Sequence, residues 1–339
     1  MIWGKVVSFT GRGAETGRRI AALLGEGKIE CYARGVDPSL EGTKLARMVQ
    51  QAMVDCNLLV FVGACGIAVR AIAPYLQGKA YDPAVLVVDE GAKFVIPLVS
   101  GHLGGANALA VRLAEGLGAQ AVVTTATDGR GLFAVDTWAR EHGCTVLNPG
   151  EIRFVSAALL RGESVGLQTD FPVQGAIPRY IKQGGGQDAG FTVDLSGARQ
   201  PFAHTLHLVP RIVCVGLGCR RGASRQAVEQ AVGAALKQAG VHIAALQAVA
   251  SIDVKRDEAG LLDFCKDHNL PAVFYSADEL RLAPGRFTAS DFVQQAVGVD
   301  NVCERAAVWH TGGGKLLMAK TAHDGVTVAL AAQNWGMEF

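Results

Sequence analysis

Apolar runs alternate along this chain with segments of helical periodicity. Several runs rich in Val, Leu and Ile end in glycine directly before a segment with apolar residues at helical spacing, a pattern that predicts strand, turn and helix. The first third is expected to hold strands at 4–9, 58–62, 85–88, 94–97 and 121–124, and helices at 17–25, 43–53, 67–76 and 107–117. Strands with so few polar residues are typical of mainly parallel sheets covered by helices on both faces.

The same alternation continues after residue 131. A shorter stretch predicts helices at 135–142 and 151–161 and strands at 145–147 and 164–168. Between 172 and 201 the pattern fades into Pro- and Gly-rich sequence, which leaves open an ordered edge hairpin or a mobile loop. The last third predicts strands at 212–217, 247–251, 272–275, 315–321 and 326–332, and helices at 224–239, 258–268, 289–296 and 303–312. Asp324-Gly325 predicts a tight hairpin turn between the last two strands.

The predicted fold class is α/β, with mainly parallel, doubly wound sheets in two major domains and a small α/β middle module. A chain of 339 residues is long enough for two or three domains. We expect an N-terminal α/β domain with a glycine-rich rim at 1–131, the middle module and a Pro/Gly-rich linker at 132–209, and a C-terminal α/β domain at 210–339.

Charge and hydropathy exclude several classes of protein. The net charge is +1 and Lys and Arg do not form runs, which argues against a dedicated nucleic-acid surface. No apolar segment reaches the roughly 18–20 residues that span a bilayer. We therefore expect no membrane contact and a cytoplasmic location. The 8 cysteines form no Cys-x-x-Cys and no zinc-type spacing, so no metal site is expected.

Small and polar residues gather where the N-terminal strands end. Carboxyl ends of parallel strands form the ligand-binding edge of open α/β sheets, and helix N-termini there receive anions. We therefore expect the 63–70 and 101–107 turns to face one cleft. The predicted substrate-binding residues of this rim are Gly63, Ala64, Cys65, Gly66, Arg70, Gly101, Gly104, Gly105, Asn107, Thr125 and Asp128.

Three of these strand-end residues are candidates for catalysis. His102 precedes a predicted helix, where the helix dipole favours a neutral imidazole that acts as a base. Asp89 and Glu90 follow the strand at 85–88, and one of them is expected within hydrogen-bonding reach of His102. The alternatives stay open: His102 packs against its turn, and Asp89 or Glu90 caps the next turn or pairs with Lys93.

A second glycine turn follows the strand at 212–217. Its predicted substrate-binding residues are Gly216, Gly218, Cys219 and Arg220, with Lys255 and Glu258 from the next strand end. The structural alternative for Lys255 and Glu258 is an N-cap with first-turn acids. Gly216-x-Gly218-x-x-x-Gly222 is one residue longer than the dinucleotide fingerprint and lacks its later acidic residue, so nucleotide binding is disfavoured.

Several motifs together resemble those of the cobalt-precorrin-5A hydrolase family. The N-terminal motifs are GACGIAVRAIAP, DPAVLVVDEGAKFVIPLVSGHLGGANALA and TTATD. The C-terminal motifs are LHLVPRIVCVGLGCRRGAS, SIDVKRDEAGLLDF and GVDNVCERAAVWHTGGGKLLMAKTAHDGVTVALA. The resemblance covers essentially the whole chain in the same order.

The resemblance implies an enzyme of anaerobic cobalamin biosynthesis. Its substrate is a cobalt-corrinoid, a ring-contracted tetrapyrrole whose δ-lactone is opened by water with release of acetaldehyde, giving cobalt-precorrin-5B. Cobalt comes with the substrate, so no separate cofactor is expected. Transient contact with neighbouring pathway enzymes is expected as well. We expect Arg70, Arg220 and Arg221 to bind carboxylate arms of the substrate. We also expect the domain boundary near residue 210 to offer a cleft for the flat macrocycle.

Under this interpretation His102 activates water, and the backbone N–H groups of Gly104 and Gly105 stabilise the lactone oxyanion. A nucleophilic Cys65 is an alternative, although no neighbour in sequence is an obvious base for it. Two other functions remain open: a non-catalytic carrier of corrinoid intermediates, and a nucleotide-dependent oxidoreductase.

Overall fold

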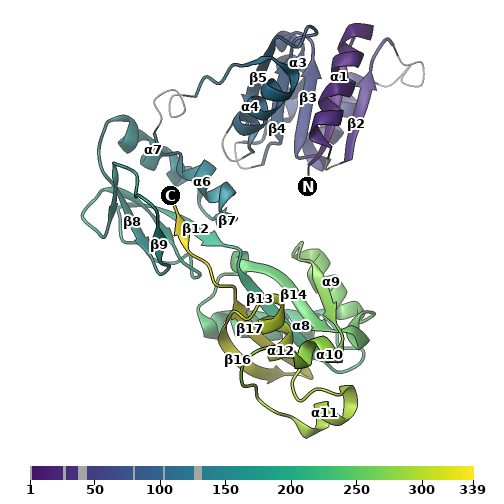
Figure 1. The fold of residues 1–339 in the computed structure, drawn as a ribbon, viewed down its shortest axis with the longest axis vertical. Coiled ribbons are helices and arrows are strands. Elements are labelled where there is room, and N and C mark those ends of the chain that lie inside the picture. Colours follow the sequence, from purple (N-terminus) through teal and green to yellow (C-terminus); the bar gives the residue numbers. More distant parts are fainter. Residues whose placement is uncertain (1, 26–27, 37–43, 79–80, 102–103, 126–131) are drawn as a thin grey trace. The chain divides into compact units, whose positions relative to one another are not determined.

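The chain forms two compact units, which divide between Trp138 and Ala139. The computed structural model describes residues 2–25, 28–36, 44–78, 81–101, 104–125 and 132–339 (Figure 1). His102 and Asp128, both predicted site residues, lie outside these ranges. Each unit is described by itself.

The N-terminal unit is a doubly wound α/β sheet. Its strands are β1 (Trp3–Ser8), β2 (Lys28–Ala33), β3 (Leu58–Val62), β4 (Ala84–Val88), β5 (Phe94–Val99) and β6 (Gln120–Ala121), in the order β2-β1-β3-β4-β5-β6. Its helices are α1 (Gly11–Leu24), α2 (Leu45–Asp55), α3 (Cys65–Ile72), η2 (Ala73–Tyr75), α4 (Ala106–Leu117) and α6 (Val135–Glu141), the last of which crosses into the second unit.

Burial on both faces explains the continuous apolar strands of this sheet. In β3, Leu58, Val60 and Val62 join the core beneath α1 and α4, whereas Leu59 and Phe61 join the core beneath α2 and α3. The prediction of helices on each side of a mainly parallel sheet is thus confirmed, because alternate side chains of one strand point to opposite faces.

The second unit begins with a small sheet in the order β10-β8-β11-β12-β7. These strands are β7 (Cys144–Val146), β8 (Val165–Thr169), β10 (Ile181–Gln183), β11 (Ala189–Val193) and β12 (His204–Pro210), and the helices beside them are η3 (Pro149–Glu151) and α7 (Ile152–Leu160). Only β7 is antiparallel to its neighbour. We call this sheet with its helices the middle module.

The segment 172–201, left open by the sequence, contains ordered strands rather than an edge hairpin. Its β11 is an inner strand of the sheet, and every residue of it is buried. Phe202 lies across the sheet, where a Cβ built on Gly166 or Gly190 would meet the Phe202 ring at 2.1 or 2.3 Å. Glycine in these strands therefore makes room for an aromatic ring, and this weakens the apolar pattern on which strand prediction depends.

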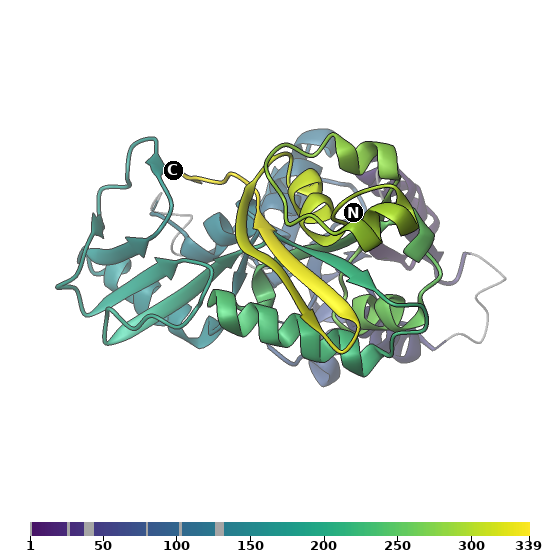
Figure 2. The ribbon, with the colours of Figure 1, turned by 90° about the horizontal axis from the view of Figure 1, so that it is seen from below.

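A second, larger sheet follows in the order β15-β14-β13-β17-β16. Its strands are β13 (Val213–Cys219), β14 (Leu246–Ile252), β15 (Ala272–Tyr275), β16 (Lys315–His323) and β17 (Val326–Ala332), with helices α8 (Arg225–Ala239), η4 (Ile243–Ala245), η5 (Asp253–Lys255), α9 (Ala259–Asp267), α10 (Ala277–Arg281), α11 (Asp291–Val297) and α12 (Cys303–His310). The β16–β17 hairpin is the long yellow ribbon of Figure 2. Asp324 and Gly325 both have positive φ at its turn, as predicted.

The end of the chain returns to the middle module. The strand β18 (Met337–Glu338) pairs in parallel with β9 (Val173–Gln174), and the two lie side by side in Figure 1. Met337 is fully buried, and Trp335 contacts Phe171 edge-on at 4.8 Å between ring centroids. This small two-stranded sheet thus connects the two five-stranded sheets of the second unit.

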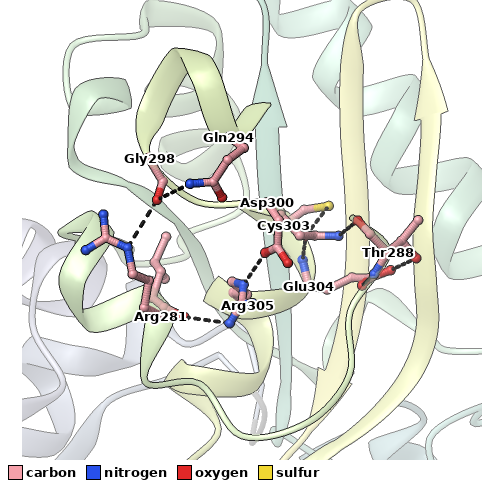
Figure 3. A network of polar contacts seen from close by, with 10 residues as sticks. Arg281, Thr288, Gln294, Gly298, Asp300, Cys303, Glu304 and Arg305 are labelled. Carbon is pink, nitrogen blue, oxygen red and sulfur yellow. Dashed lines mark hydrogen bonds and ion pairs between the residues drawn. The ribbon is translucent and has the colours of Figure 1, made fainter. Parts of the chain in front are cut away.

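A buried carboxylate of α12 connects this helix to β16 and to the loop that contains Thr288 (Figure 3). Glu304, 1% exposed, accepts hydrogen bonds from the N–H and hydroxyl of Thr288 at 2.7 and 2.9 Å, and from the N–H of Lys320 at 2.6 Å. The Asn301 side chain accepts from the Glu304 N–H at 2.8 Å, at the start of α12. Hydrogen bonds to both oxygens compensate for the burial of this carboxylate.

Among the described residues, no helix is long and apolar enough to cross a membrane.

Close packing of α12 on β13 requires glycine at position 216. A Cβ built there would lie 1.7 Å from the carbonyl oxygen of Cys303. We expect Gly216→Ala to lower the free energy of unfolding by about 1–3 kcal/mol, the usual cost of overpacking. Urea unfolding of the full chain measures it.

The matched control is Gly233→Ala in α8, where a Cβ would meet no atom within 4 Å. Alanine there should stabilise the helix by about 0.5–1 kcal/mol. Equal effects of the two substitutions would show that the contact with Cys303 does not determine the residue at position 216.

The pair of Tyr275 and His310 makes this unit sensitive to acid. Their Oη and Nδ1 atoms lie 2.8 Å apart, and burial lowers the pKa of His310 below its ordinary 6.5. Below about pH 6.5 the unfolded chain binds the proton more readily, so stability falls as the pH falls. His310→Gln should therefore reduce the loss of unfolding free energy between about pH 7.5 and 5.5. An unchanged loss would exclude His310 as its source.

Candidate functional site

The direction of β5 separates the predicted rim residues into two groups. β1, β3 and β4 are parallel, so their carboxyl ends share one edge of the N-terminal sheet. β5 is antiparallel to β4: Val99 pairs with Val85 near the start of β4, and Val95 pairs with Val88 at its end. Residues that follow β5 therefore begin at the opposite edge, about 13–16 Å away along the strand at roughly 3.3 Å per residue.

The prediction that the 63–70 and 101–107 turns face one cleft is consequently wrong. Only residues 89–93 connect β4 to β5, and parallel strands need a crossover of about a dozen residues or more. A connection this short makes a hairpin. The short spacing between the two apolar runs already indicated this hairpin in the sequence.

At the first edge, the carboxylates of Asp89 and Glu90 accept hydrogen bonds from groups of the adjacent turns. The Asp89 carboxylate accepts hydrogen bonds from the N–H groups of Gly91, Lys93 and Phe94 at 3.0, 2.7 and 2.7 Å. Glu90 accepts from the hydroxyl of Thr10, the N-cap of α1, at 2.9 Å. This matches the turn-capping alternative.

The expected pairing of Asp89 or Glu90 with His102 stays a prediction. His102 itself is outside the described residues, but the adjacent Gly101 follows β5 at the opposite edge of the sheet.

The turn between β3 and α3 lies at the first edge, beside the end of β1. Here α1 covers one face of the sheet and α3 the other, which is the switch point where open α/β sheets bind ligands. Ala64, the N-cap of α3, makes no side-chain capping bond. The Arg70 guanidinium lies 3.6–3.9 Å from a Cβ built on Gly66, in the first turn of the helix. Helix N–H groups and an exposed guanidinium are thus close together, an arrangement that suits a carboxylate.

The second edge brings together the described residues around position 102. The N–H of Asn107 donates to the carbonyl of Gly101 at 2.9 Å, and its side-chain amide donates to the hydroxyl of Thr125 at 3.0 Å. A Cβ on Gly104 would lie 2.4 Å from that of Ser100, so Gly104 is required by packing. Gly105 has φ 80° before α4. Gly101, Gly104, Gly105, Asn107 and Thr125 therefore form one cluster, the β5–α4 cluster.

Sequence reasoning missed Ser100, which shapes this cluster. It is 8% exposed and has a positive φ of 58°, which costs a non-glycine residue roughly 1–2 kcal/mol. Its hydroxyl donates to the carbonyl of Asp82 at 2.8 Å, just before β4. A strained, buried serine beside a candidate site is the type of feature that marks functional loops, and no sequence pattern revealed it.

In the C-terminal turn, both predicted glycines face packed neighbours. Gly216 is buried against α12, and a Cβ on Gly218 would lie 2.6 Å from the hydroxyl of Thr327. Arg220 is exposed, pairs with Asp324 at 3.2 Å and lies over Gly325. Burial raises the pKa of Cys219, which keeps it a thiol.

Glu258 already occupies the anion-receiving part of this turn. Its carboxylate accepts from the N–H of Gly222 at 2.9 Å and pairs with Lys255 at 3.0 Å. Burial raises the pKa of Glu258, but these two contacts outweigh it and leave the pKa below its ordinary value. Lys255 and Glu258 therefore lie together at this strand end, in mutual contact.

Within the described ranges, no group of three or more His, Cys, Asp or Glu residues is placed to hold a metal ion.

Comparison with known proteins covers most of the chain. The family described as cobalamin synthesis G matches with its N-terminal segment at residues 47–128 and its C-terminus at 213–331, and the cobalamin biosynthesis central region matches at 133–210. A cobalt-precorrin-5A hydrolase of Salmonella typhimurium is 34% identical over 94% of this chain and 94% of its own length. One from Priestia megaterium is 28% identical over 80% and 78%.

A solved structure from Sulfolobus solfataricus, described as a putative cobalamin biosynthesis protein G homolog, is also similar. It is 22% identical over 98% of each chain, with a TM-score of 0.43. The match of all three segments and the full-length identity with the Salmonella enzyme carry the assignment: this chain belongs to the cobalt-precorrin-5A hydrolase family of cobalamin biosynthesis.

Proposed function

We propose that this protein hydrolyses cobalt-precorrin-5A to cobalt-precorrin-5B and acetaldehyde. The observation that carries the proposal is the 34% identity with the Salmonella hydrolase over 94% of both chains. The substrate brings its own cobalt, and its acetate and propionate arms are anionic. The cytoplasmic location expected from the sequence stays a prediction.

The reaction needs water, a base and an acceptor for negative charge. Water adds to the lactone carbonyl, and the acyl–oxygen bond breaks to give a carboxylate and an alkoxide. The alkoxide oxygen then forms the aldehyde carbonyl while the carbon–carbon bond to the ring breaks. The macrocycle accepts that electron pair and takes up a proton, so acetaldehyde leaves with the former meso carbon and its methyl group.

We assign the water-activating role to His102 and the charge-stabilising role to backbone N–H groups of the β5–α4 cluster. In support, the N–H groups of Gly104 and Gly105 donate to no described residue. Asn107 and Thr125 lie in the same cluster and are assigned to substrate binding. Asp89 and Glu90, whose carboxylates make turn contacts, are assigned no part in this step.

Carboxylate arms of the substrate are assigned to arginines at two places. Arg70 lies over the uncapped start of α3 in the N-terminal unit, and Arg220 lies at the hairpin turn of the second unit. The carboxylate of Glu258 already contacts the N–H of Gly222, so a substrate arm there would need to replace it.

His102→Asn is expected to lower acetaldehyde release by about 10²–10⁴-fold, because asparagine keeps a hydrogen-bonding group but is no base near neutral pH. Substrate binding should persist. Activity of the unmodified enzyme should also fall below neutral pH, as the imidazole takes up a proton. Trapping acetaldehyde from the purified protein with its lactone substrate measures both.

His268→Asn is the control, since His268 contacts Glu229 and belongs to the second unit, whereas the β5–α4 cluster belongs to the first. Near-normal turnover by His102→Asn would remove the catalytic role from this histidine. Binding without acetaldehyde release by the unmodified protein would favour a corrinoid carrier instead.

Arg220→Ala is expected to weaken substrate binding by about 1–3 kcal/mol, the scale of a charge-assisted hydrogen bond. Stability should change little, because Arg220 is exposed and its ion pair with Asp324 is solvated. Arg225→Ala, which removes the exposed pair with Asp267, is the matched control. A lower melting temperature with unchanged affinity would make Arg220 a structural residue.

A further inference from the structure

Ser100 contacts the residues that lead into α4 at more than one point. Its carbonyl oxygen accepts a hydrogen bond from the N–H of Ala106, the first residue of the helix, at 3.1 Å. A Cβ built on Gly104 would lie 2.4 Å from the Cβ of Ser100, so Gly104 packs directly on the serine side chain. The residue that follows β5 thus restrains the residues that precede α4.

The hydroxyl of Ser100 attaches this region to another part of the N-terminal unit. It donates to the backbone carbonyl of Asp82 at 2.8 Å, just before β4. Asp82 is itself fixed, because its carboxylate accepts hydrogen bonds from the N–H groups of Gln77 and Gly78 at 2.8 and 3.1 Å. Ser100 is buried, so water competes little for its bond to Asp82. The start of α4 is therefore anchored through one buried hydroxyl.

The backbone of Ser100 has a conformation that serine rarely adopts. Its φ of 58° lies in the left-handed region, which only glycine enters without a steric penalty. Such a residue persists where its surroundings determine it, and such residues gather at active sites and ligand clamps. At Ser100 the determining contacts are the bond to Asp82 and the packing of Gly104. Glycine would relieve the strain but would remove both contacts.

The proposed lactone opening requires donors that are fixed before the reaction starts. Charge develops on the lactone oxygen in the transition state, and N–H groups stabilise it best when they need no rearrangement. Gly104 and Gly105, to which this role is assigned, have no side chains to restrict their backbones, and Gly105 has a φ of 80°. Neighbouring residues must therefore restrain these two glycines, and Ser100 contacts Gly104 directly.

We propose that Ser100 is a positioning residue of the hydrolysis, whose buried hydroxyl and strained backbone hold Gly104 and Gly105 with their N–H groups in place for the oxyanion. The proposal rests on the proposed function, since it takes lactone opening as the reaction. No bond to Ser100 forms or breaks. Its contribution is to kcat rather than to KM, because the oxyanion exists in the transition state and not in the bound substrate.

Two substitutions separate the hydroxyl from the strain. Ser100→Ala removes the hydroxyl but keeps a Cβ in the left-handed conformation, whereas Ser100→Gly removes both the hydroxyl and the strain. The melting temperature of Ser100→Gly should therefore be the higher of the two. We expect kcat for acetaldehyde release to fall by about 10–100-fold in both variants, with KM little changed. Ser100→Gly should be no faster than Ser100→Ala, because its backbone is freer.

The N-terminal unit contains a control for each effect. Ala92, between β4 and β5, is 6% exposed and has a φ of 51°, so Ala92→Gly relieves a similar strain at the other edge of the sheet. Thr16 in α1 is 4% exposed and donates its hydroxyl to the carbonyl of Glu90 at 3.0 Å. Thr16→Val therefore removes a comparable buried hydrogen bond. Both variants should keep the kcat of the unmodified protein.

Steady-state release of acetaldehyde by the full-length proteins measures kcat and KM. A kcat of Ser100→Gly equal to that of Ala92→Gly, or a higher KM with unchanged kcat, would overturn the proposal. Hydrogen exchange gives a second measure that needs no activity. The N–H groups of Ala106 and Asn107 donate to the carbonyls of Ser100 and Gly101, and they should exchange faster in Ser100→Gly than in the unmodified protein.

The two measurements distinguish failure of the proposal from failure of the proposed function. Equal acetaldehyde release by the unmodified protein and by Ser100→Gly would refute the positioning role alone, and so would equal hydrogen exchange. Faster exchange in Ser100→Gly, together with no release by the unmodified protein, would refute the hydrolase function.

Discussion

The short connection between β4 and β5 is the constraint on which the N-terminal site depends. Residues 89–93 cannot cross over the sheet, so β5 runs back along β4 and the chain re-emerges at the opposite edge. Asp89 stabilises this reversal by accepting hydrogen bonds from three N–H groups of the turn. Asp89, a candidate catalytic residue in the sequence, therefore caps the turn that sets the direction of β5.

This reversal gives the N-terminal unit two separate polar edges with different chemistry. The first edge has the uncapped start of α3 beneath the Arg70 guanidinium, which suits an anion. The second has the β5–α4 cluster, where a strained Ser100 and tightly packed glycines hold N–H groups and the Asn107–Thr125 contact in place. The two edges of this unit thus present different polar groups.

Close packing, rather than ligand binding, explains many glycines of the second unit. Gly166 and Gly190 make room for the Phe202 ring, and Gly216 makes room for the carbonyl of Cys303. The buried Glu304 then connects α12 to Thr288 and β16. The pairing of β18 with β9 forms a small sheet that connects the two five-stranded sheets of this unit.

Local pattern was sufficient for many of the elements and for the family. Apolar runs such as 58–62, the Asp324-Gly325 turn and the motifs around Gly63 and Gly216 are short-range features, and each predicted its strand, hairpin or resemblance correctly. Tertiary structure alone decided which of these features meet. The antiparallel pairing of β5 places Gly101 and Asp89 at opposite edges of the sheet. The carboxylate of Glu258 accepts a hydrogen bond from the N–H of Gly222. The ring of Phe202 packs on Gly190 in the inner strand β11. Such contacts join residues distant in sequence, and their energies come from packing and hydrogen bonds that no local periodicity encodes.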